Sequence, residues 1–291
     1  MIRLKLKKFY KTLIHLLFMC LYGKVYISKS TGTYVNKIKI DDSNFKSYEN
    51  KFYNLYNIRN ARIYTDNNEN VAIIKNNLLL PNVSFQQVYG KLKNTKYNSV
   101  IKKGTPSFVK KIKGKVFNLS QGSSGNNYFH FIFDIVPKIY LLRSKINLKD
   151  IDYFYISDPK KWQIEILKIL GISKNKLLSS KKYNHIFADE IYAVDHPWYN
   201  KGFVYYNVKK IPKWIIHKNR ETFFYKSKNN SKKKIFLDRS LSSYNHCQIG
   251  NIEVVNKLIA KKKIKSYRTE KLSLKSKINL LRNSSVVIGA H

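Results

Sequence analysis

The residues best suited to chemistry lie in the segment 126–138, which reads NNYFHFIFDIVPK. Its His130 and Asp134 stand four positions apart in an otherwise aromatic and aliphatic run. On an α-helix, Asn127, His130, Asp134 and Pro137 fall on one stripe. A buried polar group without a partner costs roughly 2–7 kcal/mol, so this stripe must face hydrogen-bond partners or a water-filled cleft. The pair is therefore either a structural hydrogen bond or part of a catalytic site.

The position of this segment favours the functional interpretation. A Gly/Ser loop over 120–126 precedes it and follows a predicted strand over 115–119. Open α/β sheets bind their ligands at the carboxyl ends of strands, where this loop lies. The loop lacks the Gly-Lys-Ser/Thr ending of a P-loop.

A second group of candidate residues follows two predicted strands near the end of the chain. Its members are Arg239, Ser240, Gly289 and His291. Carboxyl ends of parallel strands share one edge of a sheet, so Arg239 and His291 can converge on one ligand. An arginine there can clamp a phosphate with two hydrogen bonds, and a glycine permits close approach of the backbone. The alternative for Arg239 alone is a surface salt bridge with an acid such as Glu253.

Metal-binding patterns are poor. Asp150-Ile151-Asp152 resembles the Asp-x-Asp of some nucleotide-sugar enzymes, but it overlaps the start of a predicted strand and reads as a turn. No metal site is expected. The two cysteines, Cys20 and Cys247, can build neither a disulfide framework nor a zinc site. The segment 195–199 follows a strand, and Trp198 within it offers either an aromatic shelf for a sugar ring or an ordinary packed loop.

Alternating strands and helices must position these residues. Between 115 and 226 the sequence predicts strands over 115–119, 151–156 and 185–194, and helices over 127–143, 159–170 and 211–226. Beyond a polar linker, strands over 234–237, 264–267 and 285–288 alternate with helices over 252–262 and 274–282. This alternation predicts an α/β fold with parallel sheets. Residues before 105 indicate short strands and loops.

We expect four parts along the chain: an N-terminal segment 1–25, an α/β domain 26–226, a linker 227–233 and a partial second α/β domain 234–291. A doubly wound domain needs more than three strands, so the second domain is expected to be incomplete.

The formal net charge of +39 is compatible with an anionic partner. However, 48 of the 56 basic residues are lysines scattered along the chain, and only eight are arginines. The lysine-, asparagine- and isoleucine-rich composition is typical of an AT-rich coding sequence. We therefore interpret the charge mainly as background, and expect no specific nucleic-acid partner.

The N-terminal segment is basic and then apolar over Leu13–Tyr22. This run is shorter than the ~18 apolar residues that a membrane-spanning helix requires. It is either a helix lying in a membrane interface or an ordinary first helix packed on the domain.

Two segments of the chain resemble the family 61 glycosyltransferases, which include bacterial capsular polysaccharide enzymes. NNYFHFIFDIVPK resembles that family's Asn-x-Tyr-His-x-x-x-Asp-x-x-Pro-Arg motif, and the stretch from IFLDRS to SVVIGAH resembles its second half. Together the matches span about 116–291. Phe129 is an extra residue within the motif, Lys138 replaces a common arginine and Lys277 a common glutamine. Tyr244–His246 stand where a second arginine is usual. The family's Gly-Ala-Gly-Leu ending is absent.

The resemblance implies a GT-B-like α/β architecture with two Rossmann-like domains, the second incomplete here. It implies inverting, metal-independent transfer from a nucleotide-sugar donor to a capsular or lipopolysaccharide-type glycan, free or lipid-linked. No cofactor is expected. Asp134 or His130 would be the base, with the other orienting it. The donor diphosphate would be bound by Arg239, Ser240, Gly289 and His291, and substrate positioned by Asn127 and Trp198.

The two cysteines fit a cytoplasmic location, and the basic and apolar N-terminal segment is compatible with peripheral contact to the inner face of the membrane. A different class of function is a basic nucleic-acid or membrane-surface binding protein, which would bind anions without using the His130 and Arg239 motifs. A third alternative is an inactive remnant fragment.

Overall fold

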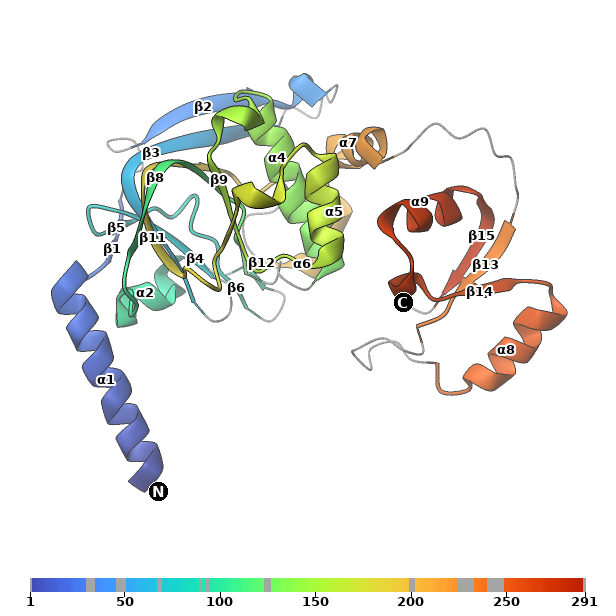
Figure 1. Ribbon diagram of the computed structural model, residues 1–291, viewed down its shortest axis with the longest axis horizontal. Coiled ribbons are helices and arrows are strands. Elements are labelled where there is room, and N and C mark those ends of the chain that lie inside the picture. Colours follow the sequence, from blue (N-terminus) through green and yellow to red (C-terminus); the bar gives the residue numbers. More distant parts are fainter. Residues whose placement is uncertain are drawn as a thin grey trace. The chain divides into compact units, whose positions relative to one another are not determined.

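The computed structural model describes residues 2–29, 35–45, 51–66, 70–88, 91–92, 95–122, 127–198, 202–223, 233–239 and 249–289. The chain divides into two compact units, Met1–Asn219 and Arg220–His291 (Figure 1). Both units combine helices with a sheet, so the predicted α/β class is confirmed.

A mixed sheet forms the first unit. Nine strands among the described residues belong to it: β1 (Tyr26–Ile27), β2 (Asn36–Asp41), β3 (Phe52–Thr65), β4 (Val71–Lys75), β5 (Leu78–Leu79), β8 (Lys110–Asn118), β9 (Tyr153–Ile156), β10 (Leu177–Ser179) and β11 (His185–Val194). Their order is β1-β5-β4-β3-β11-β8-β9-β10, with β2 beside β3. Apart from this sheet, β6 (Gln87–Val88), β7 (Lys91–Leu92) and β12 (Gly202–Phe203) form a small antiparallel ladder.

The sheet is parallel in one half and mainly antiparallel in the other. From β11 through β8 and β9 to β10 every pairing is parallel, as the alternation over 115–226 predicts. On the other side of β11, the strand β3 pairs antiparallel with β11, β2 and β4. The parallel sheet expected from the sequence therefore describes only the half that follows residue 110.

The fourteen-residue strand β3 shows that the prediction of only short strands before residue 105 is wrong. Asparagines interrupt the apolar pattern of this stretch and read as turn residues in sequence. In the structure, the Asn54 side chain donates to Asp195 at 2.8 Å and that of Asn57 to Glu190 at 3.0 Å. These partners come from β11 or its end, more than 130 residues away, so tertiary contacts override the local signal.

The first unit also contains helices, and the N-terminal one extends away from the sheet (Figure 1). They are α1 (Ile2–Tyr22), α2 (Ser99–Lys103), α3 (Tyr128–His130), the π-helical turn η3 (Phe131–Ile135), α4 (Val136–Arg143), α5 (Lys161–Ile169), α6 (Val204–Asn207) and α7 (Lys213–Phe223). The predicted helices over 127–143, 159–170 and 211–226 are thus confirmed within a few residues. No helix in the described ranges combines the length and apolar character needed to cross a membrane.

Short 3₁₀ turns join several of these elements: η1 (Asp42–Phe45), η2 (Thr95–Tyr97), η4 (Leu148–Asp150), η5 (Lys174–Lys176), η6 (Val208–Lys210) and η7 (Thr269–Lys271). The main core lies along the central strands, where Tyr56, Ile58, Val116 and Ile191 are buried in one cluster. Hydrophobic burial holds these central strands in place. The loops that carry the candidate site extend from the carboxyl ends of two of them, β8 and β11.

The second unit is a small parallel α/β layer. It contains β13 (Lys233–Leu237), α8 (Ile252–Lys261), β14 (Lys265–Tyr267), α9 (Leu274–Arg282) and β15 (Ser284–Gly289). β13 lies in the centre and pairs parallel with both neighbours. These five elements confirm the predictions for this part of the chain. All of the predicted linker except Lys233, which begins β13, lies outside the described residues, so its boundaries stay predictions.

A β-bulge in β8 requires glycine at position 114. The pairing between β8 and β11 shifts there, because three steps from Ile112 to Lys115 face two steps from Ala188 to Glu190. Gly114 has a φ of +97°, and a Cβ on it would lie 2.2 Å from the Asp152 carboxylate.

We predict that Gly114→Ala lowers the free energy of unfolding by more than the ~1–2 kcal/mol that a left-handed backbone costs an ordinary residue. The extra loss comes from displacing Asp152, whose carboxylate accepts from the Lys115 backbone N–H at 2.7 Å. Urea denaturation measures it. Gly171→Ala is the matched control, since Gly171 has a φ of +89° but open space around it. Equal losses in the two variants would contradict the steric argument.

Candidate active site

The segment that carries His130 and Asp134 is one continuous helix with a π-helical turn in its middle. Asn127 caps its start, where the side-chain oxygen accepts from the His130 backbone N–H at 3.2 Å. In η3 the Val136 N–H reaches back to the Phe131 carbonyl. A π-turn holds one residue more than an α-turn and is frequent at functional sites. The extra residue relative to the family motif, Phe129, lies two residues before this turn.

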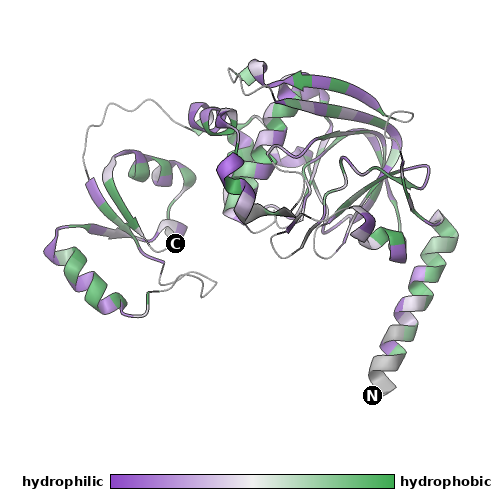
Figure 2. Cartoon of the chain, turned by 180° about the vertical axis from the view of Figure 1, so that it is seen from behind, coloured by the Kyte–Doolittle hydropathy of each residue, from purple (hydrophilic) through white to green (hydrophobic). Residues whose placement is uncertain are grey.

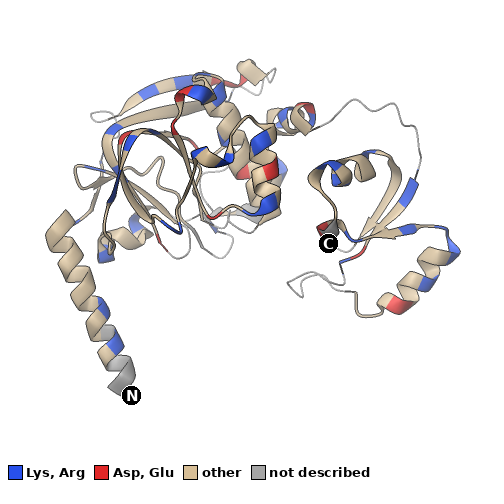
Figure 3. Ribbon diagram, in the orientation of Figure 1, with Lys and Arg blue, Asp and Glu red and all other residues tan. Residues whose placement is uncertain are grey.

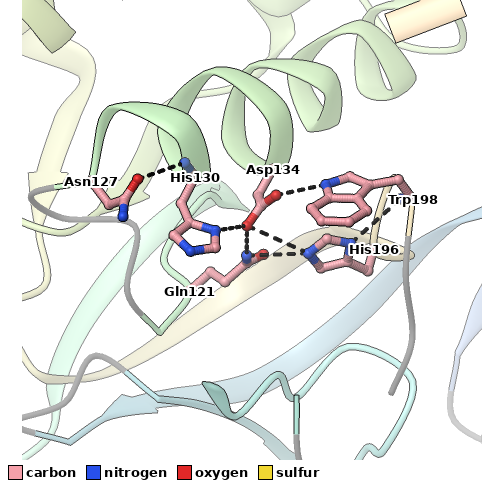
Figure 4. Close-up of polar contacts among 6 residues, drawn as sticks. All are labelled: Gln121, Asn127, His130, Asp134, His196 and Trp198. Atoms are coloured by element: carbon pink, nitrogen blue, oxygen red, sulfur yellow. Dashed lines mark hydrogen bonds and ion pairs between the residues drawn. The ribbon is translucent and has the colours of Figure 1, made fainter. Parts of the chain in front are cut away.

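The Asp134 carboxylate is the centre of a buried hydrogen-bond network (Figure 4). Its side chain is 0% exposed. Oδ2 accepts from the Gln121 amide at 2.7 Å and from His130 Nδ1 at 2.8 Å, and Oδ1 accepts from the Trp198 indole Nε1 at 2.7 Å. His196 Nε2 lies 3.7 Å from Oδ2. The predicted His–Asp pair therefore forms, and the stripe faces partners.

Two neighbouring parallel strands supply these partners. Gln121 follows the end of β8, and His196 and Trp198 follow the end of β11. β8 and β11 pair side by side and parallel, so their carboxyl ends lie at one edge of the sheet. The helix of His130 and Asp134 also starts after β8. All the groups around Asp134 are thus brought together by one sheet edge.

Hydrogen bonds to Asp195 hold the segment that carries His196 and Trp198 against the sheet. Its carboxylate accepts from the Asn54 backbone and side chain, both at 2.8 Å, and from the Tyr56 hydroxyl at 2.7 Å. Burial and the Asp195 charge raise the pKa of Tyr56, so its hydroxyl stays a donor. These bonds anchor the first residue after β11 to β3.

The network favours an ionised Asp134. Burial alone raises the pKa of this carboxyl, but His196 and the hydrogen bond from His130 outweigh burial and hold the pKa below its ordinary value. An ionised carboxylate only accepts hydrogen bonds, so His130 Nδ1 must be the donor. Nε2 is then the ring nitrogen of His130 that can offer an acceptor lone pair.

His196 is the second histidine of the site, and it is buried. Burial lowers its pKa below the ordinary value, against the opposing attraction of Asp134. The Gln121 amide nitrogen lies 3.2 Å from His196 Nε2. The Trp198 backbone nitrogen lies 3.4 Å from Nδ1 of the same ring, so the contact with Gln121 is the shorter of the two. An amide nitrogen has two N–H groups, so Gln121 can donate to Asp134 and His196 together.

Lys138 lies on the same helix as Asp134, one turn further on, and is 1% exposed. Its Nζ has no hydrogen-bond partner among the described residues and lies 4.9 Å from the centre of the Phe85 ring. Phe85 in turn meets His196 edge-on, with ring centroids 5.6 Å apart. Burial lowers the pKa of Lys138 to about 7, although Asp134 opposes the shift.

The sequence predicts roles for His130, Asp134, Asn127 and Trp198. In the structure Asn127 caps the start of the helix, and the other three belong to the hydrogen-bond network around Asp134. Trp198 is 8% exposed and donates to Asp134; its predicted role as a sugar shelf stays a prediction, as does substrate contact by Asn127. Sequence reasoning did not single out Gln121 and His196. Their place directly after two predicted strands was the signal that could have found them.

The donor-side candidates lie in the second unit. Arg239 is exposed two residues past β13, and Gly289 ends β15, where it pairs with Leu237 of β13. The carboxyl ends of these adjacent parallel strands share one edge, as predicted. Ser240 and His291 lie outside the described residues. In the described ranges, no three His, Cys, Asp or Glu side chains are grouped to hold a metal ion.

The His130–Asp134 site lies at the carboxyl ends of parallel strands, where open α/β sheets bind their ligands. The family model for Glycosyltransferase 61 matches residues 128–291, from the His130 helix through β15. Because this match covers more than half of the chain, the protein belongs to the family 61 glycosyltransferases, and it is a glycosyltransferase. No curated protein matches the chain.

The buried lysine gives a prediction for stability against pH. The unfolded chain carries Lys138 with its ordinary pKa of 10.5, and the folded protein with a pKa of about 7. Between these values the unfolded state binds a proton that the folded state does not, so Lys138 penalises folding increasingly as pH falls from 10 to 7. We expect Lys138→Met to raise the free energy of unfolding by about 2–4 kcal/mol at pH 7, with the gain shrinking toward pH 10.

Urea denaturation at several pH values measures this difference. Lys145→Met, at an exposed lysine just past the same helix, is the matched control and should change stability little at any pH. A Lys138→Met variant whose stability follows that of the wild type from pH 7 to 10 would show that Lys138 is not a buried titrating group.

Proposed function

We propose that this glycosyltransferase moves a sugar from a nucleotide-sugar donor to a hydroxyl of a cell-surface glycan, with inversion at the anomeric carbon and without a metal. The proposed acceptor is a bacterial capsular or lipopolysaccharide-type glycan, carried on a lipid at the inner face of the cytoplasmic membrane. The observation that carries this proposal is the buried Asp134 carboxylate bonded to His130 Nδ1 at 2.8 Å.

His130 is the proposed base, and Asp134 the residue that positions it. His130 retains some exposure, with a side chain 9% accessible, whereas that of Asp134 is 0% accessible. A carboxylate that accepts three strong hydrogen bonds is a weak base, whereas a neutral imidazole is suited to take a proton near pH 7. Asp134 also stabilises the imidazolium that forms, as the aspartate of a catalytic triad does.

The proposed reaction is a single displacement. The acceptor oxygen forms a bond to the anomeric carbon while the bond from that carbon to the donor diphosphate breaks. The hydroxyl proton passes to His130 Nε2, and the diphosphate leaves with the bonding electrons. Attack opposite to the leaving group gives inversion.

The leaving diphosphate needs cations and backbone donors. We propose that Arg239, with Ser240, Gly289 and His291, supplies them in the second unit, in a GT-B-like arrangement. The support is the shared carboxyl edge of β13 and β15, together with the match of the family model to this segment. The alternative of a nucleic-acid-binding protein is not favoured by the family match.

Replacing either residue of the pair should abolish transfer and spare donor binding. We expect Asp134→Asn and His130→Gln each to lower kcat by about 10²–10⁴-fold, the usual contribution of a positioned acid or base. The measurement is release of the nucleoside diphosphate from a panel of nucleotide sugars, alongside calorimetric binding of the same donors.

The matched control is His185→Gln. His185 is also buried, but it begins β11, at the opposite end of that strand from His196, and contacts the Ser107 carbonyl at 2.8 Å. Turnover should persist in this variant as long as it is folded. Unchanged turnover in Asp134→Asn and His130→Gln would refute the assignment of the pair.

The donor assignment has a separate test. Loss of a charge-assisted hydrogen-bonding arginine typically costs about 1.5–3 kcal/mol, so Arg239→Ala should weaken binding of nucleoside diphosphates roughly 10–100-fold. Lys257→Ala, at an exposed lysine of α8, controls for the loss of one positive charge from the same unit. Equal affinities for the wild type and Arg239→Ala would remove Arg239 from the donor site.

A further inference from the structure

One face of α1 packs on the rest of the first unit. Phe18 meets Phe108 edge-on with ring centroids 5.0 Å apart, and Tyr22 meets His185 at 5.1 Å. The Tyr22 hydroxyl also accepts from the Val109 backbone N–H at 3.0 Å. The last turns of α1 are therefore anchored by their own side chains.

The opposite face of α1 carries a continuous apolar arc. Seven large apolar side chains are each at least 49% exposed: Leu6, Phe9, Tyr10, Leu13, Leu16, Leu17 and Leu21. At 100° per residue, their spacing places them on an arc of roughly 140°, opposite Phe18 and Tyr22. Figure 2 shows the apolar character of the part of α1 nearest the domain. Scattered exposed apolar residues are ordinary, but a continuous arc of this size marks an interaction surface.

The chain segments that form α1 and α2 are basic or neutral. Residues 1–40 contain no Asp or Glu, and neither do residues 70–133, which include α2. Lys7 and Lys11 are exposed on α1, and Lys102 and Lys103 on α2 (Figure 3). Burial lowers the pKa of His15, which lies on α1. The charges of Lys103 and Lys11 lower this pKa further, so both lysines lie near the middle of α1.

We propose that α1 docks the protein on a membrane surface that contains anionic phospholipids. The apolar arc enters the boundary between headgroups and acyl chains, and the positive charges of α1 and α2 attract the anionic headgroups. The helix then lies along the surface, because Phe18 and Tyr22 on its other face contact the protein.

Charge and width distinguish a lipid surface from a second copy of the helix. A two-stranded coiled coil uses a narrow apolar seam flanked by charges of opposite sign on the two helices. The arc on α1 is wider than such a seam, and two copies would oppose lysines with no acidic partner. An anionic bilayer satisfies both the arc and the lysines.

Docking does not depend on the proposed reaction. Its consequence for the enzyme does rest on the proposed function: a lipid-linked acceptor would lie at the same surface as the first unit, which carries the His130–Asp134 pair.

Co-sedimentation of the full chain with vesicles tests the docking. We expect binding to vesicles of phosphatidylcholine mixed with phosphatidylglycerol, weak binding to phosphatidylcholine alone, and weakening by salt. Leu17→Glu should reduce binding about tenfold or more, since it removes a large apolar side chain from the arc and adds a negative charge. Exchange of both Lys7 and Lys11 for Gln should reduce binding to the mixed vesicles selectively.

The matched control is Leu258→Glu on α8, because Leu258 is 57% exposed and Leu17 is 55% exposed. This variant should bind vesicles like the wild type. Absence of vesicle binding, or equal losses in the two variants, would overturn the proposal. A concentration-dependent dimer in light scattering that Leu17→Glu dissociates would assign the arc to a second copy instead. Vesicle binding by His130→Gln separates this result from the reaction.

Discussion

A buried carboxylate must be supplied with hydrogen bonds, and the first unit is organised around this requirement at Asp134. An unpaired ion in such a position would be too costly to keep, because desolvation penalises a charge far more than a neutral group. Gln121, His130 and Trp198 each donate to Asp134 at 2.7–2.8 Å. The donors come from three chain segments, so the site forms only when the fold does.

The sheet explains how distant segments reach one carboxylate. β8 and β11 are adjacent and parallel, and the loops that leave their carboxyl ends meet at one edge. Asp195 fixes the loop after β11 to β3, while the π-turn lies in the helix that presents Asp134. Lys138 adds a second buried ionisable group to the same helix, at a cost in stability.

Local patterns predicted much of the architecture. The strand over 185–194, the helix over 274–282 and the three strands of the second unit follow from apolar runs bounded by polar turns, and the structure confirms them. The strand β3 did not follow, because Asn54 and Asn57 find their partners more than 130 residues away, in β11 and just past its end. Spacing on a helix likewise predicted the His130–Asp134 pair. Gln121 and His196 could not be assigned in the same way, since their roles depend on which strands are neighbours.

The most direct test of the central claim is the protonation of the His130 ring. Protein labelled with ¹⁵N in its histidines, with His130 assigned from the spectrum of His130→Gln, reports which ring nitrogen carries the proton. An ionised Asp134 that accepts from Nδ1 predicts a proton on Nδ1, which leaves Nε2 as the nitrogen that takes the proton of the acceptor hydroxyl. A proton on Nε2 and none on Nδ1 would contradict the account, because Asp134 could then neither orient His130 nor leave it as a base.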